Sequence, residues 1–222
     1  MASFQNNGRL KLLIIVGTRP EIIRLAAVIR KCRKYFDTIL AHTGQNYDYN
    51  LNGVFFHDLE LADPEVYMDA VGDTLGQTMG NIIAKSYDLM VELQPDAVLV
   101  LGDTNSCLSV IGAKRLHIPI FHLEAGNRCK DECLPEETNR RIVDIVSDVN
   151  LCYSEHARRY LADCGLPKER TYVTAAPWQK CCTKTSPKSR PATSTPGWAW
   201  KRVSTSCSPR TARRTSTRRR TL

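Results

Sequence analysis

The chain has 222 residues, and its formal net charge of +8 is unevenly distributed. Residues 1–174 carry 19 basic against 23 acidic side chains, whereas residues 175–222 carry 12 basic side chains and no acidic one. Residues 175–222 also contain few aliphatic side chains, so they cannot bury enough apolar surface to offset the entropy of ordering. We therefore expect one folded domain at residues 1–174 and a disordered basic tail at residues 175–222.

The composition argues against a membrane protein and against a secreted, disulfide-rich one. No apolar run approaches the roughly 20 residues that a membrane span needs, and the polar residues 1–10 do not form a secretory signal. We therefore expect a cytoplasmic protein whose nine cysteines are reduced thiols. Cys129 and Cys133 lack the further cysteines or histidines that would complete a zinc site, so we expect neither a metal nor a cofactor.

Strands and helices alternate along residues 1–174. Unbroken apolar runs predict buried parallel strands, and apolar residues at helical spacing predict helices between them. The predicted strands are residues 10–16, 38–42, 97–101, 118–121, 149–153 and 170–173, with a little strand in the connector 59–67. The predicted helices are residues 22–35, 50–58, 73–92, 107–116, a helix that begins at Pro135, and 154–164. This alternation predicts an α/β fold with a doubly wound parallel sheet.

Polar loops follow four of the predicted strands, at residues 17–21, 43–48, 102–106 and 124–128. The carboxyl ends of parallel strands meet at one edge of a sheet, so these loops should converge where open α/β sheets bind ligands. The loop at 17–21 also precedes a helix N-terminus, which favours anions, although it is not a glycine-rich dinucleotide fingerprint.

Four acidic residues in or beside these loops are candidates for chemistry. Glu124 lies at the end of a buried strand, which favours a functional role over a structural one. Asp103 is equally well explained as the N-cap of the next helix and as a catalytic group. Glu136 and Glu137 fall in the first turn of a helix. The helix dipole alone favours carboxylates there, so structural and functional roles are equally supported.

Five motifs resemble, in order, those of the non-hydrolysing UDP-N-acetylglucosamine 2-epimerase family. They are GTRPE at 17–21, HTGQNYD at 42–48, LGDTNS at 101–106, HLEAGNR at 122–128 and PEETNR at 135–140. The resemblance covers residues 11–174. It implies one Rossmann-like half of a glycosyltransferase-B-like fold, in which two such domains enclose a UDP-sugar, and it implies a homodimer. The runs EAGNRC and CLPEETNR are more similar to the branch that leads to UDP-N-acetyl-L-fucosamine.

The resemblance also implies a reaction and roles for individual residues. The family is held to invert C2 of a UDP-2-acetamido sugar by eliminating UDP, which leaves a glycal, and adding it back. Acids and bases must then reach both faces of the sugar. By resemblance, the catalytic carboxylate positions are Asp103, Glu124 and Glu136. The implied substrate-binding residues are Arg19, Arg24, Arg128 and Asn139, with Arg24 in place of the family's more usual lysine.

Residues 175–222 depart from the family pattern. The resemblance stops after Thr174, and a one-base shift of the reading frame lets the codons of 175–184 and 208–217 spell segments similar to the family's second domain. We therefore interpret the tail as out of frame, with the loss of a catalytic histidine that the family carries there. The family makes precursors of bacterial surface polysaccharides, but this copy is expected to have no measurable epimerase activity.

Two other functions fit parts of the sequence. The basic residues and three tryptophans of the tail would suit electrostatic binding and stacking of nucleic acid. An accidental reading frame explains that composition better, so we expect no specific nucleic-acid partner. A non-catalytic sugar-nucleotide binder would instead keep its affinity for UDP-sugars. The expected partner is a UDP-sugar, and no membrane partner is expected.

Overall fold

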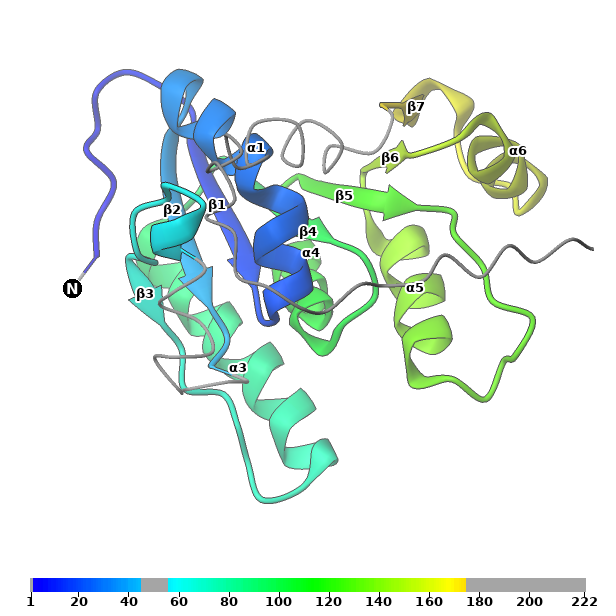
Figure 1. Ribbon diagram of the computed structural model, residues 1–222, viewed down its shortest axis with the longest axis horizontal. Coiled ribbons are helices and arrows are strands. Elements are labelled where there is room, and N and C mark those ends of the chain that lie inside the picture. Colours follow the sequence, from blue (N-terminus) through cyan, green and yellow to red (C-terminus); the bar gives the residue numbers. More distant parts are fainter. Residues whose placement is uncertain (1, 45–55, 175–222) are drawn as a thin grey trace, which may run out of the picture. The chain divides into compact units, whose positions relative to one another are not determined.

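The computed structural model describes residues 2–44 and 56–174, and these residues build one parallel sheet (Figure 1). Its strands are β1 (Lys11–Val16), β2 (Asp37–His42), β3 (Val66–Tyr67), β4 (Ala97–Leu101), β5 (Ile120–Ala125), β6 (Val149–Cys152) and β7 (Thr171–Val173). They lie in the order β3-β2-β1-β4-β5-β6-β7, and every neighbouring pair is parallel. The predicted α/β fold with a doubly wound parallel sheet is confirmed.

Helices connect the strands as the alternating pattern predicts. They are α1 (Arg19–Tyr35), α3 (Leu75–Leu93), the 3₁₀ turn η1 (Asn105–Ser109), α4 (Val110–Arg115), α5 (Pro135–Val146), α6 (Glu155–Asp163) and the 3₁₀ turn η2 (Lys168–Arg170). Of the helix predicted at residues 50–58, residues 56–58 are helical, and the rest lies outside the described residues. Within the described residues, no helix is both long and apolar enough to cross a membrane.

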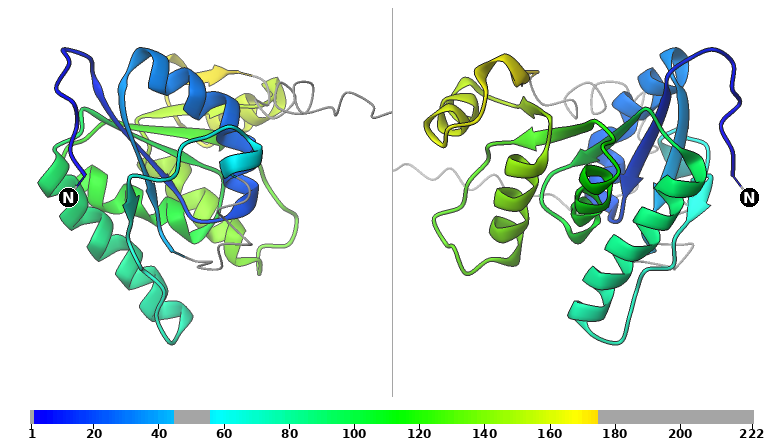
Figure 2. Two further views of the ribbon diagram at one scale, coloured as in Figure 1. Left: turned by 60° about the vertical axis from the view of Figure 1, so that its left-hand side comes forward. Right: turned by 180° about the vertical axis from the view of Figure 1, so that it is seen from behind.

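Apolar side chains cover both faces of the sheet, which is why its strands read as unbroken apolar runs. α1 packs on one face through Ile22, Leu25 and Ile29. The other face receives α3, α4 and α5, which contribute Met90, Val110 and Val143 among others. Figure 2 shows these three helices in front of the sheet when the molecule is seen from behind. α6 packs in a smaller cluster against the ends of β5 and β6.

Three predicted boundaries were wrong, each for a local reason. α1 begins at Arg19, inside the expected turn at 17–21, because Thr18 caps it and Pro20 fits a first helical turn. The strand predicted at 118–121 is instead Ile120–Ala125, since its polar residues find buried partners. The helix predicted at 107–116 begins as the 3₁₀ turn Asn105–Ser109 and becomes α-helical only at Val110.

The strand order reverses between β1 and β4, which lie side by side although α1, β2, β3 and α3 separate them in the sequence. Loops after β1 and β4 therefore run in opposite directions and leave a crevice at their carboxyl ends. The loops that begin at Gly17 and Gly102 flank this point. The fold thus places two of the predicted polar loops where doubly wound proteins bind ligands.

Candidate active site

Glu21 joins the two loops at the switch point. It stands in the first turn of α1, where its Oε2 accepts hydrogen bonds from the backbone N–H groups of Gly17 (2.8 Å) and Thr18 (2.7 Å). Its Oε1 accepts from the hydroxyl groups of Thr104 (2.8 Å) and Ser106 (2.5 Å) in the loop after β4. One buried carboxylate therefore holds the first loop and the Asp103 loop together.

Glu21 is 1 % exposed, and this burial dominates its electrostatics. Burial raises the pKa of its carboxyl group, although the hydrogen bonds from Ser106, Gly17, Thr104 and Thr18 each lower that pKa. Donors aimed at a carboxylate favour its charged form, whereas loss of water disfavours it, and here loss of water is the larger effect.

Asp103 follows β4 and contacts two residues of α5. Its carboxylate accepts a hydrogen bond from Arg140, and its backbone oxygen accepts one from the Asn139 side chain at 2.9 Å. Asn139 also donates to the Asn105 side chain at 3.2 Å. The alternative in which Asp103 caps the next helix is wrong, because Thr104 takes the N-cap position. Asn139 therefore positions the loop that carries Asp103.

Glu124 is aimed by an irregularity in β5. The pairing of β5 with β6 shifts between Leu123 and Ala125, and Glu124 has the left-handed φ of 71°. In a regular strand Glu124 would face the opposite side from Leu123, which packs in the cluster that includes α1. The extra residue of a bulge re-aims such a side chain. Glu124 accordingly reaches Arg24 on α1, with 2.7 Å between Oε2 and Nη1.

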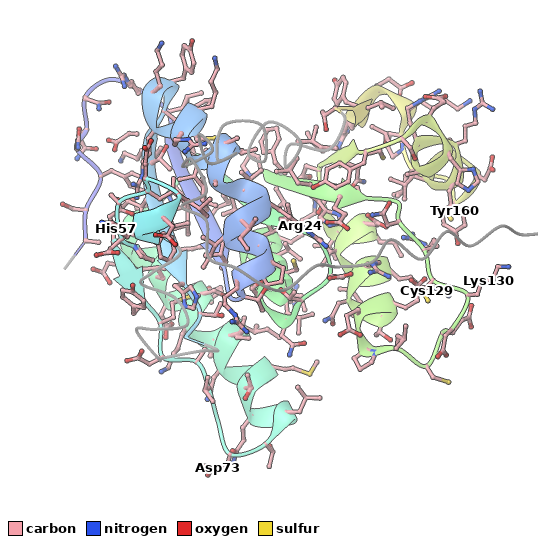
Figure 3. The ribbon with its side chains drawn as sticks, in the orientation of Figure 1. Arg24, His57, Asp73, Cys129, Lys130 and Tyr160 are labelled. Carbon is pink, nitrogen blue, oxygen red and sulfur yellow. The ribbon has the colours of Figure 1, made fainter. Side chains whose placement is uncertain are left out.

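The Glu124 carboxylate lies beside the loop that carries Asp103. Its Oε1 accepts from the Asn127 side chain at 3.1 Å. A Cβ atom added to Gly102 would lie 3.7 Å from Glu124 Oε2, so this carboxylate borders the backbone next to Asp103. Figure 3 shows Arg24 on α1, the helix that covers this face of the sheet. Glu124 and Arg24 thus form a partly exposed ion pair, with side chains 11 % and 41 % exposed.

The structure separates Glu136 from Glu137, which the sequence leaves equivalent. Glu137 is 1 % exposed and accepts a hydrogen bond from the Cys129 N–H at 3.0 Å and from Arg141 at 3.1 Å. Burial alone would raise the pKa of Glu137, but these donors and the nearby arginines lower it. Glu137 is thus a structural acid that fixes the loop after β5. Glu136 is exposed at the start of α5.

Asp144 anchors α5 beneath the end of β5. It accepts hydrogen bonds from the Gly126 N–H at 3.2 Å and from Arg128 at 2.6 Å, and His122 Nδ1 lies 3.0 Å from it. Burial would raise the pKa of Asp144, but His122 and Arg128 outweigh burial and lower it. Arg128 also stacks over the ring of Tyr160 at 4.6 Å. The predicted substrate ligand Arg128 is therefore held by α5 and α6.

Four of the seven predicted site residues contact one another in two pairs, which are Arg24 with Glu124 and Asn139 with Asp103. Arg128 instead contacts Asp144 of α5. Arg19 begins α1 beside the same loops, and Glu136 begins α5. Residues 45–48 of the second polar loop lie outside the described residues. His42, which precedes that loop, is buried, and burial lowers its pKa to about 4.

Sequence reasoning missed Glu21, Arg140 and Asp144. Glu21 carried a usable signal, because Thr18 and Glu21 have the spacing of a capping box, and the Glu21 carboxylate accepts a hydrogen bond from the Thr18 N–H. Asp144 interrupts the apolar residues of α5, and an acid at such a position needs a buried partner. Among residues 2–44 and 56–174, no group of three histidine, cysteine or acidic side chains is arranged to hold a metal.

A doubly wound parallel sheet with acids and arginines gathered at its switch point defines a Rossmann-like domain. A family model described as UDP-N-acetylglucosamine 2-epimerase matches residues 30–204, a range that ends beyond residue 174. The chain belongs to this family. The family resemblance of the five motifs is thereby confirmed.

Individual relatives support the same assignment. The chain is 40 % identical over 168 residues to UDP-2,3-diacetamido-2,3-dideoxy-D-glucuronate 2-epimerase of Pseudomonas aeruginosa, covering 74 % of this chain and 47 % of the relative. It is 36 % identical over 166 residues to UDP-N-acetylglucosamine 2-epimerase of Methanocaldococcus jannaschii, covering 74 % and 45 %. The chain thus spans about half the length of the curated relatives it matches.

Solved structures give a similar result. UDP-N-acetylglucosamine 2-epimerase from Rickettsia bellii matches with a TM-score of 0.77 and 48 % identity, covering 81 % of this chain and 48 % of that one. The Methanocaldococcus jannaschii enzyme in complex with UDP-GlcNAc and UDP matches with a TM-score of 0.71 and 35 % identity, covering 74 % and 46 %. The described domain therefore has the fold of one half of these epimerases.

Proposed function

We propose that residues 1–174 supply the carboxylate half of the active site of a UDP-2-acetamido sugar 2-epimerase. The observation that carries the proposal is the Glu124–Arg24 pair beside Asp103 at the switch point of the sheet. A carboxylate and a cation side by side suit a substrate that must lose a proton at carbon and a diphosphate at the neighbouring carbon. The family resemblance assigns the reaction as loss and re-addition of UDP.

The Glu124–Arg24 pair suggests how substrate prepares the base. Without substrate, the guanidinium of Arg24 donates a hydrogen bond to Glu124 and so occupies one oxygen of its carboxylate. A UDP-sugar diphosphate offers Arg24 more negative charge and bidentate geometry. Binding would then draw Arg24 away and leave Glu124 to act on the sugar. Asp103 and Glu136 are proposed as the other catalytic carboxylates, and Arg19, Arg128 and Asn139 as further groups that orient substrate.

We further propose that the 222-residue polypeptide alone does not turn over UDP-sugars. The proposal is supported by its match to about half the length of its relatives. A site with protein on only one side of the substrate leaves water at the reaction centre. Water weakens every electrostatic contact there. The complete enzyme of this family is proposed to make a surface-polysaccharide precursor, and the branch resemblance favours a 2-acetamido-2,6-dideoxy sugar as substrate. The homodimer stays a prediction, which sedimentation would check.

The proposed function is tested by separating binding from turnover. Purified protein should show no interconversion of UDP-N-acetylglucosamine in a coupled assay, yet it should bind UDP weakly by NMR titration. Arg24→Ala should reduce that affinity about tenfold, since it removes a charge-assisted contact with the diphosphate. Arg159→Ala, which removes an exposed arginine of α6, should not. Turnover well above a blank would refute the inactivity, and UDP binding unaffected by Arg24→Ala would refute the assignment of the site.

A further inference from the structure

Tyr153 carries a buried hydroxyl group that nothing in the described residues uses. Its oxygen is shielded from solvent and has no hydrogen-bond partner there. Tyr153 directly follows β6, and Cys152 of β6 pairs with Ala125 of β5. Tyr153 therefore stands at the carboxyl edge of the sheet, next to the strand end that carries Glu124.

The surroundings of Tyr153 tie it to the same crevice. Burial raises the pKa of its phenol group, the negative charge of Glu124 raises it further, and the positive charge of Arg24 lowers it. Both members of the ion pair are thus within electrostatic range of the phenol. The phenol stays protonated at neutral pH and can donate a hydrogen bond.

An unpaired buried hydroxyl is costly to the free protein. Leaving such a donor without a partner costs about 1–3 kcal/mol, and most buried polar side-chain atoms are paired. A phenylalanine would fill nearly the same space without that cost. The hydroxyl group of Tyr153 is therefore better explained by a contact made in another state of the protein.

We propose that the Tyr153 hydroxyl donates a hydrogen bond to an oxygen of the hexose ring or its 2-acetamido group, and so positions the sugar against Glu124. This inference rests on the proposed function. The diphosphate is a less suitable partner, because Arg24 already offers the charge that a diphosphate attracts. The sugar must instead lie against Glu124, the proposed base. Tyr153 is thus a positioning and specificity residue for the sugar.

The proposal predicts a selective loss of affinity. In Tyr153→Phe, binding of UDP-N-acetylglucosamine measured by NMR titration should weaken about five- to tenfold, the effect of one lost hydrogen bond. Binding of UDP, which lacks the sugar, should not change. Tyr172→Phe is the matched control, because Tyr172 is a neighbouring tyrosine on β7 that is 53 % exposed. It should bind both nucleotides as the unaltered protein does.

A second measurement needs no ligand. If the hydroxyl has no partner in the free protein, Tyr153→Phe should unfold at the same or a higher urea concentration than the unaltered protein. A lower midpoint would show that the hydroxyl is already satisfied, for example by a bound water, and would overturn the proposal.

The binding experiment separates failure of this inference from failure of the proposed function. Equal affinity of Tyr153→Phe and the unaltered protein for UDP-N-acetylglucosamine would overturn the role of Tyr153 alone. Equal weakening for UDP and UDP-N-acetylglucosamine would place the contact on the nucleotide and would also overturn it. If the unaltered protein binds neither nucleotide, the proposed function fails and this inference fails with it.

Discussion

At the scale of single residues, Glu21 shows how one acid serves both folding and the site. As the third residue of α1 it completes a capping box with Thr18, and through Thr104 and Ser106 it fixes the loop beside Asp103. Because the first loop and the Asp103 loop share this carboxylate, a change at Glu21 should disturb the crevice as well as the helix start.

We predict that Glu21 makes stability fall as the pH rises. Its folded pKa is raised by burial, so its contribution is complete below the unfolded pKa of about 4.3 and is lost as the pH rises through the folded pKa. In that window the loss is about 1.4 kcal/mol per pH unit. Glu21→Gln cannot ionise and should lack this slope, which urea unfolding at a series of pH values would measure.

The quantity to follow is the difference in the free energy of unfolding between the unaltered protein and Glu21→Gln at each pH. Other groups titrate in the same pH range and would otherwise obscure the effect of Glu21. Burial lowers the pKa of His42 to about 4, so the stability that His42 contributes is lost as the pH falls. Asp144, with its lowered pKa, behaves likewise. Both contributions cancel when Glu21→Gln is subtracted from the unaltered protein. If the difference in the free energy of unfolding did not change with pH above about 4.3, the raised pKa of Glu21 would be contradicted. Glu21→Ala should lower the free energy of unfolding by about 3 kcal/mol, since it removes the acceptor of the Gly17 and Thr18 N–H groups.

At the scale of secondary-structure elements, Gly126 determines how closely α6 approaches the end of β5. It has a φ of 77°, and a Cβ atom added there would lie 2.6 Å from the backbone oxygen of Ala157 and 3.0 Å from Leu161. Gly165, after α6, has a similar φ of 84° but open space around it. The two glycines thus separate the effect of a steric clash from that of backbone strain.

We predict that Gly126→Ala destabilises the protein far more than Gly165→Ala. The substitution at Gly165 adds only left-handed strain, which costs about 1 kcal/mol. The substitution at Gly126 adds the same strain and also drives α6 away from the sheet, so we expect at least about 3 kcal/mol. Chemical denaturation of both variants measures the difference. Equal losses would mean that α6 is free to move, and the packing argument would then fail.

The same elements show what the sequence reveals. Apolar runs locate β1, β2 and β4 within a residue because a strand buried on both faces has few other compositions. The end of β5 is missed because its buried polar residues have partners that are distant in the sequence, as His122 has in Asp144. Nothing local specifies the bulge that aims Glu124 at Arg24, since the bulge depends on the register with β6.

For the acids of the site too, the sequence reveals the residues but not their contacts. Motif resemblance selects Asp103, Glu124 and Glu136 without stating their contacts. Periodicity cannot tell Glu136 from Glu137, because the direction of each side chain depends on how α5 packs. The pairings of Asp103 with Arg140 and of Glu21 with Ser106 join residues that are far apart in the sequence, so only the folded chain reveals them.

At the scale of the whole molecule, the coding DNA tests the interpretation of residues 175–222, which lie outside the described residues. If the tail arises from a change of frame, sequencing across codon 174 should show one base gained or lost relative to the family's coding pattern. An in-frame origin would contradict this interpretation, and residues 175–222 would then need their own explanation.

We propose that residues 1–174 fold without residues 175–222. The buried apolar side chains that form the three clusters lie between Phe4 and Leu161, and the last strand ends at Val173. A chain that ends at residue 174 should therefore unfold cooperatively, at a urea concentration close to that of the full chain. A chain that ends at residue 169 is the matched comparison. It removes β7, leaves backbone groups of β6 unpaired and should unfold at a lower concentration. If the chain of 174 residues is as unstable as that of 169, residues 175–222 belong to the folded domain, and the boundary at 174 is wrong.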